Sequence, residues 1–368
     1  MKIKILELFG GIGACSKALE RLGIDYEIAD YVEIDKYAVK SFNAIHNTNF
    51  EPQDVCKFDK DIEVDLIMHG SPCQDFSLAG NQAGGDEGSG TRSSLMYETI
   101  RIVEKLKPKY VIWENVKNVI SKKHKHNFDN YCNKMSELGY TNYAQVLNAK
   151  DYGIPQNRER VFTISIRKGI DKDFHFPPKQ ELKLRLKDML EEEVDEKYYL
   201  SDKMIEYITA NNEKWTGNND KSIINKSIAS AINTGEGSRR CDASNYVSNK
   251  CEENYNLKIK NATKKGYLEA EEGDGIDISS RMQYHRGNVQ KQTSQTITTM
   301  GGENVGVLMN DLRIRKLTPK ECWRLMGFDD KDYEKASQVC SNTQLYKQAG
   351  NSIVVNVLEA ILKELLCK

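Results

Sequence analysis

The sequence predicts an α/β fold with a mostly parallel sheet, together with a second, smaller and irregular β-rich domain. Through the first half of the chain, short apolar runs alternate with amphipathic helical patterns, as in proteins whose parallel strands are joined by helices. The pattern then gives way to a segment rich in Asn, Lys, Ser and Gly, and returns near the C-terminus. We therefore expect residues 1–175 and 312–368 to form one domain and residues 176–311 to form the other.

Five apolar runs rich in β-branched and aromatic residues predict the strands of the first domain. They cover residues 3–9, 26–34, 64–70, 109–116 and 160–166. In residues 93–107 the apolar side chains instead recur at roughly helical spacing, which predicts a helix between the third and fourth strands. Ligands of such sheets bind at the carboxyl ends of the strands.

Two further helices are expected near the C-terminus. Residues 317–328 are predicted to form the first of these helices. Thr318 can cap its N-terminus, Pro319 occupies the first helical position, and Glu321 lies three residues after the cap. Residues 351–366 carry apolar side chains at i, i+3 and i+4 spacing. This stripe needs a surface to cover, so we expect the last helix to pack back on the first domain.

The composition argues against several classes of protein. No apolar run of about 18 residues appears, and we expect a cytoplasmic protein. The nine cysteines are scattered without a CxxC pair, so we expect neither a disulfide framework nor a metal site. The net charge of −1 argues neither for nor against binding to nucleic acid. Residues 117–126 and 313–328, however, are strongly basic and predict a basic surface.

A glycine-rich turn follows the first expected strand. Gly11 and Gly13 would let the backbone approach a ligand at a helix N-terminus. The dinucleotide fingerprint lacks its third glycine, but Glu33 ends the next expected strand, where an acid can accept both ribose hydroxyl groups. The two features predict a nucleoside cofactor, with a purely structural turn as the alternative.

Cys73 follows the third expected strand in the stretch "GSPCQ". Pro72 fixes its own φ and restricts the residue before it, so the turn that presents the thiol is stiff. A nucleophile needs such positioning, although a cysteine after a strand is more often a buried, inert side chain. Residues 79–94 contain five glycines, so their backbone can adopt many conformations, and a surface loop without function is one interpretation.

Polar residues also interrupt or precede two other expected strands. Glu114 and Asn115 interrupt the apolar run 109–116, where a carboxyl group can act as a proton donor and helix capping is the alternative. Arg158 and Arg160 lie just before the apolar run 161–166 and should share a face, because alternate residues of a strand point the same way, although solvated surface side chains are the alternative. A thiol, a carboxyl group and guanidinium groups are thus expected at one end of the sheet.

These stretches resemble the cytosine-5 DNA methyltransferases of the bacterial and phage restriction-modification type. The motifs that carry the resemblance occur in the family's order over 1–175 and 312–368, and they are "FGGIG", "GSPCQ", "ENV", "QNRER", "RKLTPKECWRLMGF" and "QAGNS". The resemblance implies a Rossmann-like methyltransferase fold, S-adenosyl-L-methionine as cofactor and double-stranded DNA as substrate. It implies that residues 176–311 are the target recognition domain, in which residues 288–302 resemble a threonine-containing stretch near the base-reading loops.

The resemblance also implies the roles of individual residues. Cys73, after Pro72, would add to carbon 6 of a cytosine flipped out of the duplex, while Glu114 contacts ring nitrogen 3. Arg160 would hold the base near its carbonyl oxygen, with Arg158 and Asn115 in support. Residues 79–94 would close over the DNA as a lid and carry Ser77 into place. The implied cofactor site consists of Phe9, Gly11, Gly13, Glu33, Asp54, Val55, Leu95, Asn351 and Ser352.

The resemblance further implies a monomer without an obligate protein partner, associated with the nucleoid. A cognate restriction endonuclease acting on the same site is the partner that the restriction-modification type would have. One alternative is a tRNA cytosine-5 methyltransferase, but the Cys-Phe-Thr signature of that branch is not present. A second is a catalytically inactive DNA-binding homologue, against which the intact motifs argue. A nucleotide-dependent oxidoreductase is weakened by the missing third glycine.

Overall fold

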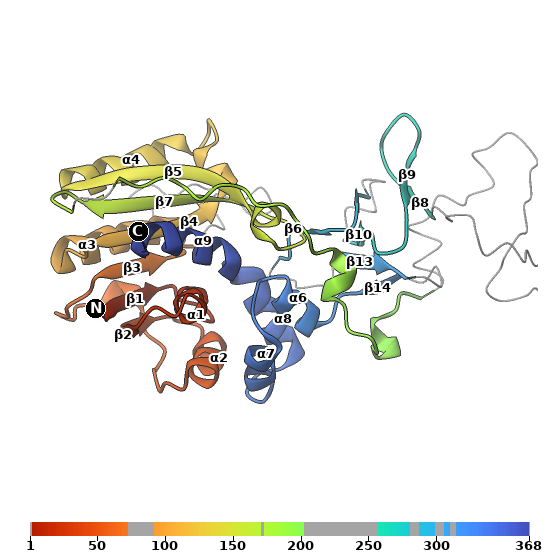
Figure 1. Ribbon diagram of the computed structural model, residues 1–368, viewed down its shortest axis with the longest axis horizontal. Helices are drawn as coiled ribbons and strands as arrows, with labels where there is room; N and C mark the ends of the chain where they lie inside the picture. Colours follow the sequence, from red (N-terminus) through yellow and green to blue (C-terminus); the bar gives the residue numbers. More distant parts are fainter. Residues whose placement is uncertain are drawn as a thin grey trace, which may run out of the picture.

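The protein is described by a computed structural model over residues 2–72, 92–170, 173–201, 257–279, 287–298, 305–309 and 314–367. Its centre is a six-stranded sheet of order β2-β1-β3-β4-β7-β5 (Figure 1). The bounds of these strands are β1 Ile3–Leu8, β2 Tyr26–Val32, β3 Leu66–His69, β4 Tyr110–Val116, β5 Tyr140–Asn148 and β7 Glu159–Arg167. The first four strands pair in parallel, whereas β7 is antiparallel to both β4 and β5. The predicted mostly parallel α/β fold is confirmed.

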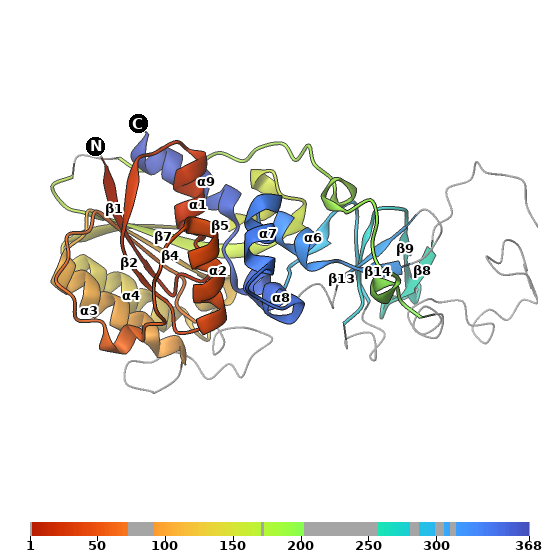
Figure 2. The same cartoon turned by 90° about the horizontal axis from the view of Figure 1, so that it is seen from below.

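Helices cover both faces of this sheet. Figure 2 shows α1 (Ala14–Arg21), α2 (Lys36–His46) and α9 (Val355–Leu366) on one side, and α3 (Met96–Leu106) and α4 (Lys125–Glu137) on the other. Successive residues of β1 enter different cores, because Ile5 packs with α1 and α9 while Leu6 packs with α3 and α4. The last helix therefore returns to the first part of the chain, as its apolar stripe predicts.

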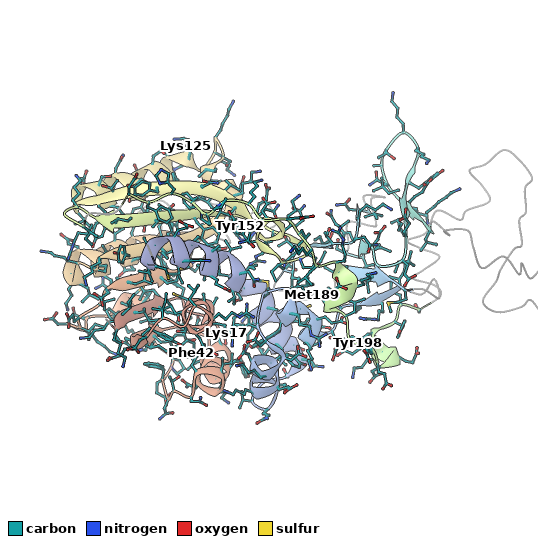
Figure 3. The ribbon with its side chains drawn as sticks, in the orientation of Figure 1. Lys17, Phe42, Lys125, Tyr152, Met189 and Tyr198 are labelled. Atoms are coloured by element: carbon teal, nitrogen blue, oxygen red, sulfur yellow. The ribbon has the colours of Figure 1, made fainter. Side chains whose placement is uncertain are left out.

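Three helices connect α9 to the rest of the chain, namely α6 (Pro319–Arg324), α7 (Asp330–Ser337) and α8 (Asn342–Asn351). The predicted start of α6 is confirmed, because Thr318 accepts a hydrogen bond from the Glu321 backbone and Glu321 accepts one from the Thr318 backbone. The ammonium group of Lys17 on α1, labelled in Figure 3, joins α7 through Asp329 at 2.8 Å and Asp332 at 3.0 Å.

A smaller β-rich region lies beside this part (Figure 1). It contains a four-stranded sheet of order β11-β10-β13-β14 and a separate hairpin of β8 and β9. The bounds are β8 Leu257–Lys260, β9 Tyr267–Ala270, β10 Gly275–Asp277, β11 Val289–Gln290, β13 Val305–Leu308 and β14 Ile314–Lys316. Six buried apolar side chains form a core of its own here. One further pairing, between β6 (Gln156–Asn157) and β12 (Ser294–Gln295), ties the segment before β7 to this region.

Short 3-10 turns complete the described chain: η1 Val55–Lys57, η2 Arg92–Leu95, η3 Lys117–Ile120, η4 Ala149–Tyr152, η5 Leu186–Met189 and η6 Glu196–Tyr198. None of the helices among the described residues has the length and apolar character required to cross a membrane. Within the same ranges, no group of three or more His, Cys, Asp and Glu side chains could hold a metal ion.

One of the two basic runs from which a basic surface was predicted, residues 313–328, is mostly paired with acids rather than exposed. Arg315 and Glu321 are both fully buried and form an ion pair at 2.7 Å. Arg324 is paired with Asp330 at 2.7 Å. The basic residues described in 313–328 therefore serve largely in packing, because their partners are acids of the same region. By contrast, Lys122 and Lys123 in the other basic run are exposed.

Candidate active site

The candidate site lies where β1, β3 and β4 end. The order of the strands reverses between β1 and β3, which lie side by side with β2 and β4 on either flank. In open α/β sheets, ligands bind outside the carboxyl ends of the strands at this point. Since β7 runs in the opposite direction, it begins at the same edge, and Arg160 pairs in register with Val116 at the end of β4.

Glu114 and Arg160 form an ion pair at this edge. Arg160 Nε lies 3.0 Å from Glu114 Oε1, and the two side chains are only 17% and 11% exposed. Glu114 lies opposite Phe162 in the register, so Arg160 is its diagonal neighbour on the same face. Glu114 Oε2 lies 3.7 Å from where a Cβ would stand at Gly70. The carboxylate thus contacts Arg160 with one oxygen and faces the turn that leads to Cys73 with the other.

That turn is held by two side chains from the opposite face of β4. Trp113 Nε1 donates a hydrogen bond to Ser71 Oγ at 3.0 Å, and Asn115 Nδ2 donates one to the Ser71 carbonyl oxygen at 3.4 Å. Trp113, Asn115 and Ser71 are all buried. Pro72 comes next and is the last described residue of this segment. The sequence analysis noted Ser71 only as the residue that Pro72 restricts, and it missed Trp113. Trp113 lies two residues before Asn115 and therefore on the same face of the strand, which could have pointed to it.

Cys73, Ser77 and residues 79–91 lie outside the described residues. The predictions for the nucleophile and for the lid therefore remain predictions.

The two arginines that were expected to share a face have different partners. Arg160 contacts Glu114, whereas Arg158 is 4% exposed and donates to backbone carbonyl groups. Its Nη1 donates to Ile297 O at 2.9 Å, and its Nη2 donates to Gly350 O at 3.1 Å and Ser352 O at 2.8 Å. The difference arises because Arg158 lies before the regular part of β7, where strand alternation does not apply.

The glycines of the turn after β1 serve different purposes. Gly11 and Gly13 both have positive φ, of 55° and 82°, which favours glycine. A Cβ at Gly11 would meet no atom within 4 Å, so this backbone borders open space. A Cβ at Gly13 would come within 2.3 Å of His46 Nε2, so this glycine is required for packing against α2. Phe9, at the start of the turn, also has a positive φ of 52°.

Glu33 lies across from Gly11. Its Oε2 accepts a hydrogen bond from the Gly11 backbone N–H at 3.2 Å, and its Oε1 accepts one from the Asp35 N–H at 2.8 Å. Burial raises the pKa of the Glu33 carboxyl group, and these two hydrogen bonds act in the opposite direction. Gly11 and Glu33, which the sequence analysis took together as signs of a nucleoside cofactor, are therefore in direct contact.

The remaining predicted cofactor residues lie on three other segments. The Gln53 N–H donates to Glu33 O at 2.8 Å, which places Asp54 and Val55 beside the end of β2. Val55 is buried in the same cluster that Leu95 contacts. Ser352 is buried and Asn351 is exposed at the end of α8. Ile353, the next residue, lies 3.5 Å from the Cβ position of Gly70.

Comparison with known proteins identifies the family. The family model of the C-5 cytosine-specific DNA methylases matches residues 3–367. The chain belongs to this family. It is a DNA (cytosine-5-)-methyltransferase, and the resemblance stated from its motifs is confirmed.

Relatives of the methyltransferase match it from end to end. It is 33% identical to the orphan methyltransferase M.SPRI of Bacillus phage SPR, over 99% of this chain and 98% of the relative. It is 34% identical to the type II methyltransferase M2.ScrFI of Lactococcus lactis subsp. cremoris, over 99% of each.

Two solved structures share the fold of the methyltransferase. A putative DNA modification methyltransferase encoded within an E. coli prophage has a TM-score of 0.61 at 21% identity, covering 99% of this chain and 98% of that one. A DNMT2 mutant of Spodoptera frugiperda has a TM-score of 0.59 at 20% identity, covering 99% of each chain. At these identities the likeness shows the fold alone.

A buried acid beneath the glycine turn escaped the sequence analysis of this methyltransferase. Glu7 on β1 is 2% exposed, and its Oε1 accepts hydrogen bonds from the backbone N–H and the hydroxyl group of Ser16. Burial raises the pKa of the Glu7 carboxyl group to about 7, and the bonds from Ser16 act in the opposite direction. Its Cβ lies 3.1 Å from the Cβ position of Gly10, so the acid supports the turn from below.

Replacing Glu7 by Gln is expected to stabilise the methyltransferase above neutral pH. The pKa of Glu7 is about 7 in the folded protein and about 4.5 in the unfolded chain, so the folded state binds more protons between these values. The free energy of unfolding therefore falls as the pH rises through this window, by an amount on the order of 3 kcal/mol. The Glu7→Gln variant has no carboxyl group at this position, so its free energy of unfolding should not fall over this pH range. Urea unfolding at a series of pH values measures the free energy of unfolding of both proteins. Glu104→Gln, at an exposed position of α3, is the control.

Proposed function

We propose that this DNA methyltransferase flips a cytosine out of the duplex, attacks carbon 6 with Cys73 and methylates carbon 5 with S-adenosyl-L-methionine. The observation that supports this proposal most is the buried Glu114–Arg160 pair. It stands at the strand edge where ligands of such sheets bind, beside the turn that ends in Pro72.

The residues around Gly11 fit the proposed cofactor. The open space beside Gly11 admits a ligand. A carboxylate can accept about four hydrogen bonds, and two backbone N–H groups bind Glu33, which leaves capacity for two ribose hydroxyl groups. Asp54 and Val55 would contact the adenine edge, Leu95 would pack nearby, and Asn351 and Ser352 would hold the amino-acid end. Phe9 and Gly13 shape the turn. S-adenosyl-L-methionine supplies an electrophilic methyl group.

The protein's own groups prepare the cytosine ring for that methyl group. The Cys73 thiolate forms a bond to carbon 6, and the electron pair of the ring double bond makes carbon 5 nucleophilic. Glu114 provides a proton at ring nitrogen 3 as the thiolate adds. Arg160 holds the carbonyl oxygen of the base and keeps the carboxyl group in place. After methylation, the carbon-5 proton passes to water, and the electron pair of that C–H bond re-forms the ring double bond and expels the Cys73 thiolate. Glu114 takes back the proton from ring nitrogen 3, which leaves neutral 5-methylcytosine.

The division of the chain supports a division of tasks. We assign catalysis and cofactor binding to residues 1–175 and 312–368, and target recognition to residues 176–311. The separate core of the small β-rich region supports this assignment, as do the exposed Lys122 and Lys123 near the end of β4, which suit contact with phosphates of double-stranded DNA. We assign a monomer acting on DNA in the cytoplasm, at the nucleoid, where a restriction endonuclease for the same site is its candidate partner.

Bisulfite sequencing tests this function. The protein would be expressed in a bacterium that lacks cytosine methylation, beside a Cys73→Ala variant. We expect conversion-resistant cytosines within one short recurring sequence in the wild type and none in the variant. If the folded wild-type protein protects no cytosine, it does not methylate DNA in these cells. If the variant protects cytosines as well as the wild type, the role of Cys73 is wrong.

A further inference from the structure

One guanidinium group joins two segments that are far apart in the sequence. Arg158 Nη1 donates to the carbonyl oxygen of Ile297 at 2.9 Å. Its Nη2 donates to the carbonyl oxygens of Gly350 at 3.1 Å and Ser352 at 2.8 Å. The first segment belongs to the threonine-containing stretch assigned to DNA recognition, and residues 294–298 are called the recognition segment below. The second is the proposed amino-acid end of the cofactor site.

The recognition segment is fastened to the residues that precede β7. The Ser294 N–H donates to Pro155 O at 2.8 Å, and Thr296 Oγ1 donates to Asn157 O at 2.9 Å. Gln156 is fully buried and its Oε1 accepts a hydrogen bond from the Ile297 N–H at 3.2 Å. The segment is therefore held by backbone and side-chain bonds on the same short stretch that carries Arg158.

The cofactor end is linked in turn to the catalytic edge. Ile353, next to Ser352, lies 3.5 Å from the Cβ position of Gly70, and Glu114 lies 3.7 Å from the same position. Arg160 follows Arg158 by two residues and pairs with Glu114. A displacement of Arg158 can therefore shift both the Glu114–Arg160 pair and residues 350–352.

Arginine suits such a junction because its geometry is fixed. The guanidinium group is planar and presents its N–H donors at set angles, so all three bonds require the two segments to keep one separation. A buried donor that loses its acceptor costs free energy. When a ligand displaces or orders one segment, the other is favoured to follow.

We propose that Arg158 is a positioning residue through which DNA binding at the recognition segment and cofactor binding at residues 350–352 strengthen each other. The proposal rests on the proposed function, because that function assigns the two segments to DNA and to the cofactor. Coupling of this kind is reciprocal, so DNA must tighten cofactor binding by the same factor by which the cofactor tightens DNA binding.

The coupling factor is the quantity to measure. Titration calorimetry would give the Kd of S-adenosylhomocysteine with and without a duplex that contains the methylated site. The ratio of the two values is the coupling factor, for which we expect about 5 or more in the wild type. In Arg158→Lys, which cannot hold both segments with one planar group, we expect the factor to fall to about 1.

Arg324→Lys is the matched control for this substitution. Arg324 also donates to two backbone carbonyl groups, those of Met189 (labelled in Figure 3) and Leu190, both at 3.1 Å. It contacts neither the recognition segment nor residues 350–352 in any hydrogen bond found among the described residues. The control should keep the wild-type coupling factor.

A milder pair of variants covers the case in which Arg158→Lys does not fold. Thr296→Val removes one bond between the recognition segment and Asn157, and Thr293→Val, three residues earlier, is its control. We expect the first to lower the coupling factor and the second to leave it unchanged. An unchanged factor in folded Arg158→Lys, or in Thr296→Val if the former does not fold, would overturn the proposal. A wild-type factor of 1 would do so too. If wild-type protein binds no S-adenosylhomocysteine at all, the proposed function itself fails.

Discussion

Glu114→Gln is expected to lower the rate of methyl transfer by about 10²- to 10⁴-fold, the usual contribution of a general acid. The amide keeps the shape of the side chain and an oxygen that can accept from Arg160. It cannot deliver the proton that ring nitrogen 3 requires when the thiolate adds to carbon 6. The Arg160 guanidinium group would also lose the charge of its partner, which lies 3.0 Å away in a mostly buried pair, and this adds to the loss.

The measurement is a single-turnover methylation assay at saturating DNA and cofactor, together with the affinity for S-adenosylhomocysteine. The chemical step should slow, and cofactor affinity should stay within about twofold, since Glu114 is placed at the base and not at the cofactor. Glu159→Gln is the matched control, because Glu159 is the neighbour of Arg160 and pairs at the surface with Lys117, with both side chains about half exposed. A Glu114→Gln enzyme within tenfold of the wild-type rate would contradict the role as acid.

Glu33→Ala is expected to weaken cofactor binding by about 100-fold or more. Each hydrogen bond from a ribose hydroxyl group to a carboxylate contributes about 1.5–3 kcal/mol, and two such bonds exceed the roughly 2.7 kcal/mol that corresponds to a factor of 100. The variant also removes the acceptor of the Gly11 N–H, so the turn at Gly11 loses support. Single-turnover rates at saturating cofactor should change far less than the Kd, because Glu33 is not placed near the reacting atoms.

The neighbouring acid is the control for this experiment. Asp35 lies two residues further on, forms an ion pair with Lys347 at 2.6 Å and caps α2 through a hydrogen bond from the Tyr37 N–H. Asparagine caps helices as well as aspartate, so Asp35→Asn should keep both the fold and the cofactor affinity. Equal losses of affinity in the two variants would show that the effect is one of local charge or folding and not of ribose binding.

Most strands of the sheet could be predicted because their side chains repeat with period two or form continuous apolar runs. β5 (Tyr140–Asn148) was missed because it lies at the edge of the sheet and mixes polar with apolar residues. The antiparallel direction of β7 was also beyond prediction, since an apolar run does not reveal which way it runs. This direction matters for the site, because it brings Arg160 to the edge where Glu114 stands.

The sequence by itself determined the family through its ordered motifs, the alternation of strands and helices, and the start of α6. These features depend on residues that are close together in the sequence, so they can be recognised without knowing the fold. Only the tertiary structure decided that Arg160 meets Glu114 while Arg158 joins Ile297 to Gly350 and Ser352. It also decided that Arg315 is buried against Glu321. Such partners follow from strand direction, register and packing between distant segments, and two arginines in one motif are chemically alike until the fold gives each its acceptors.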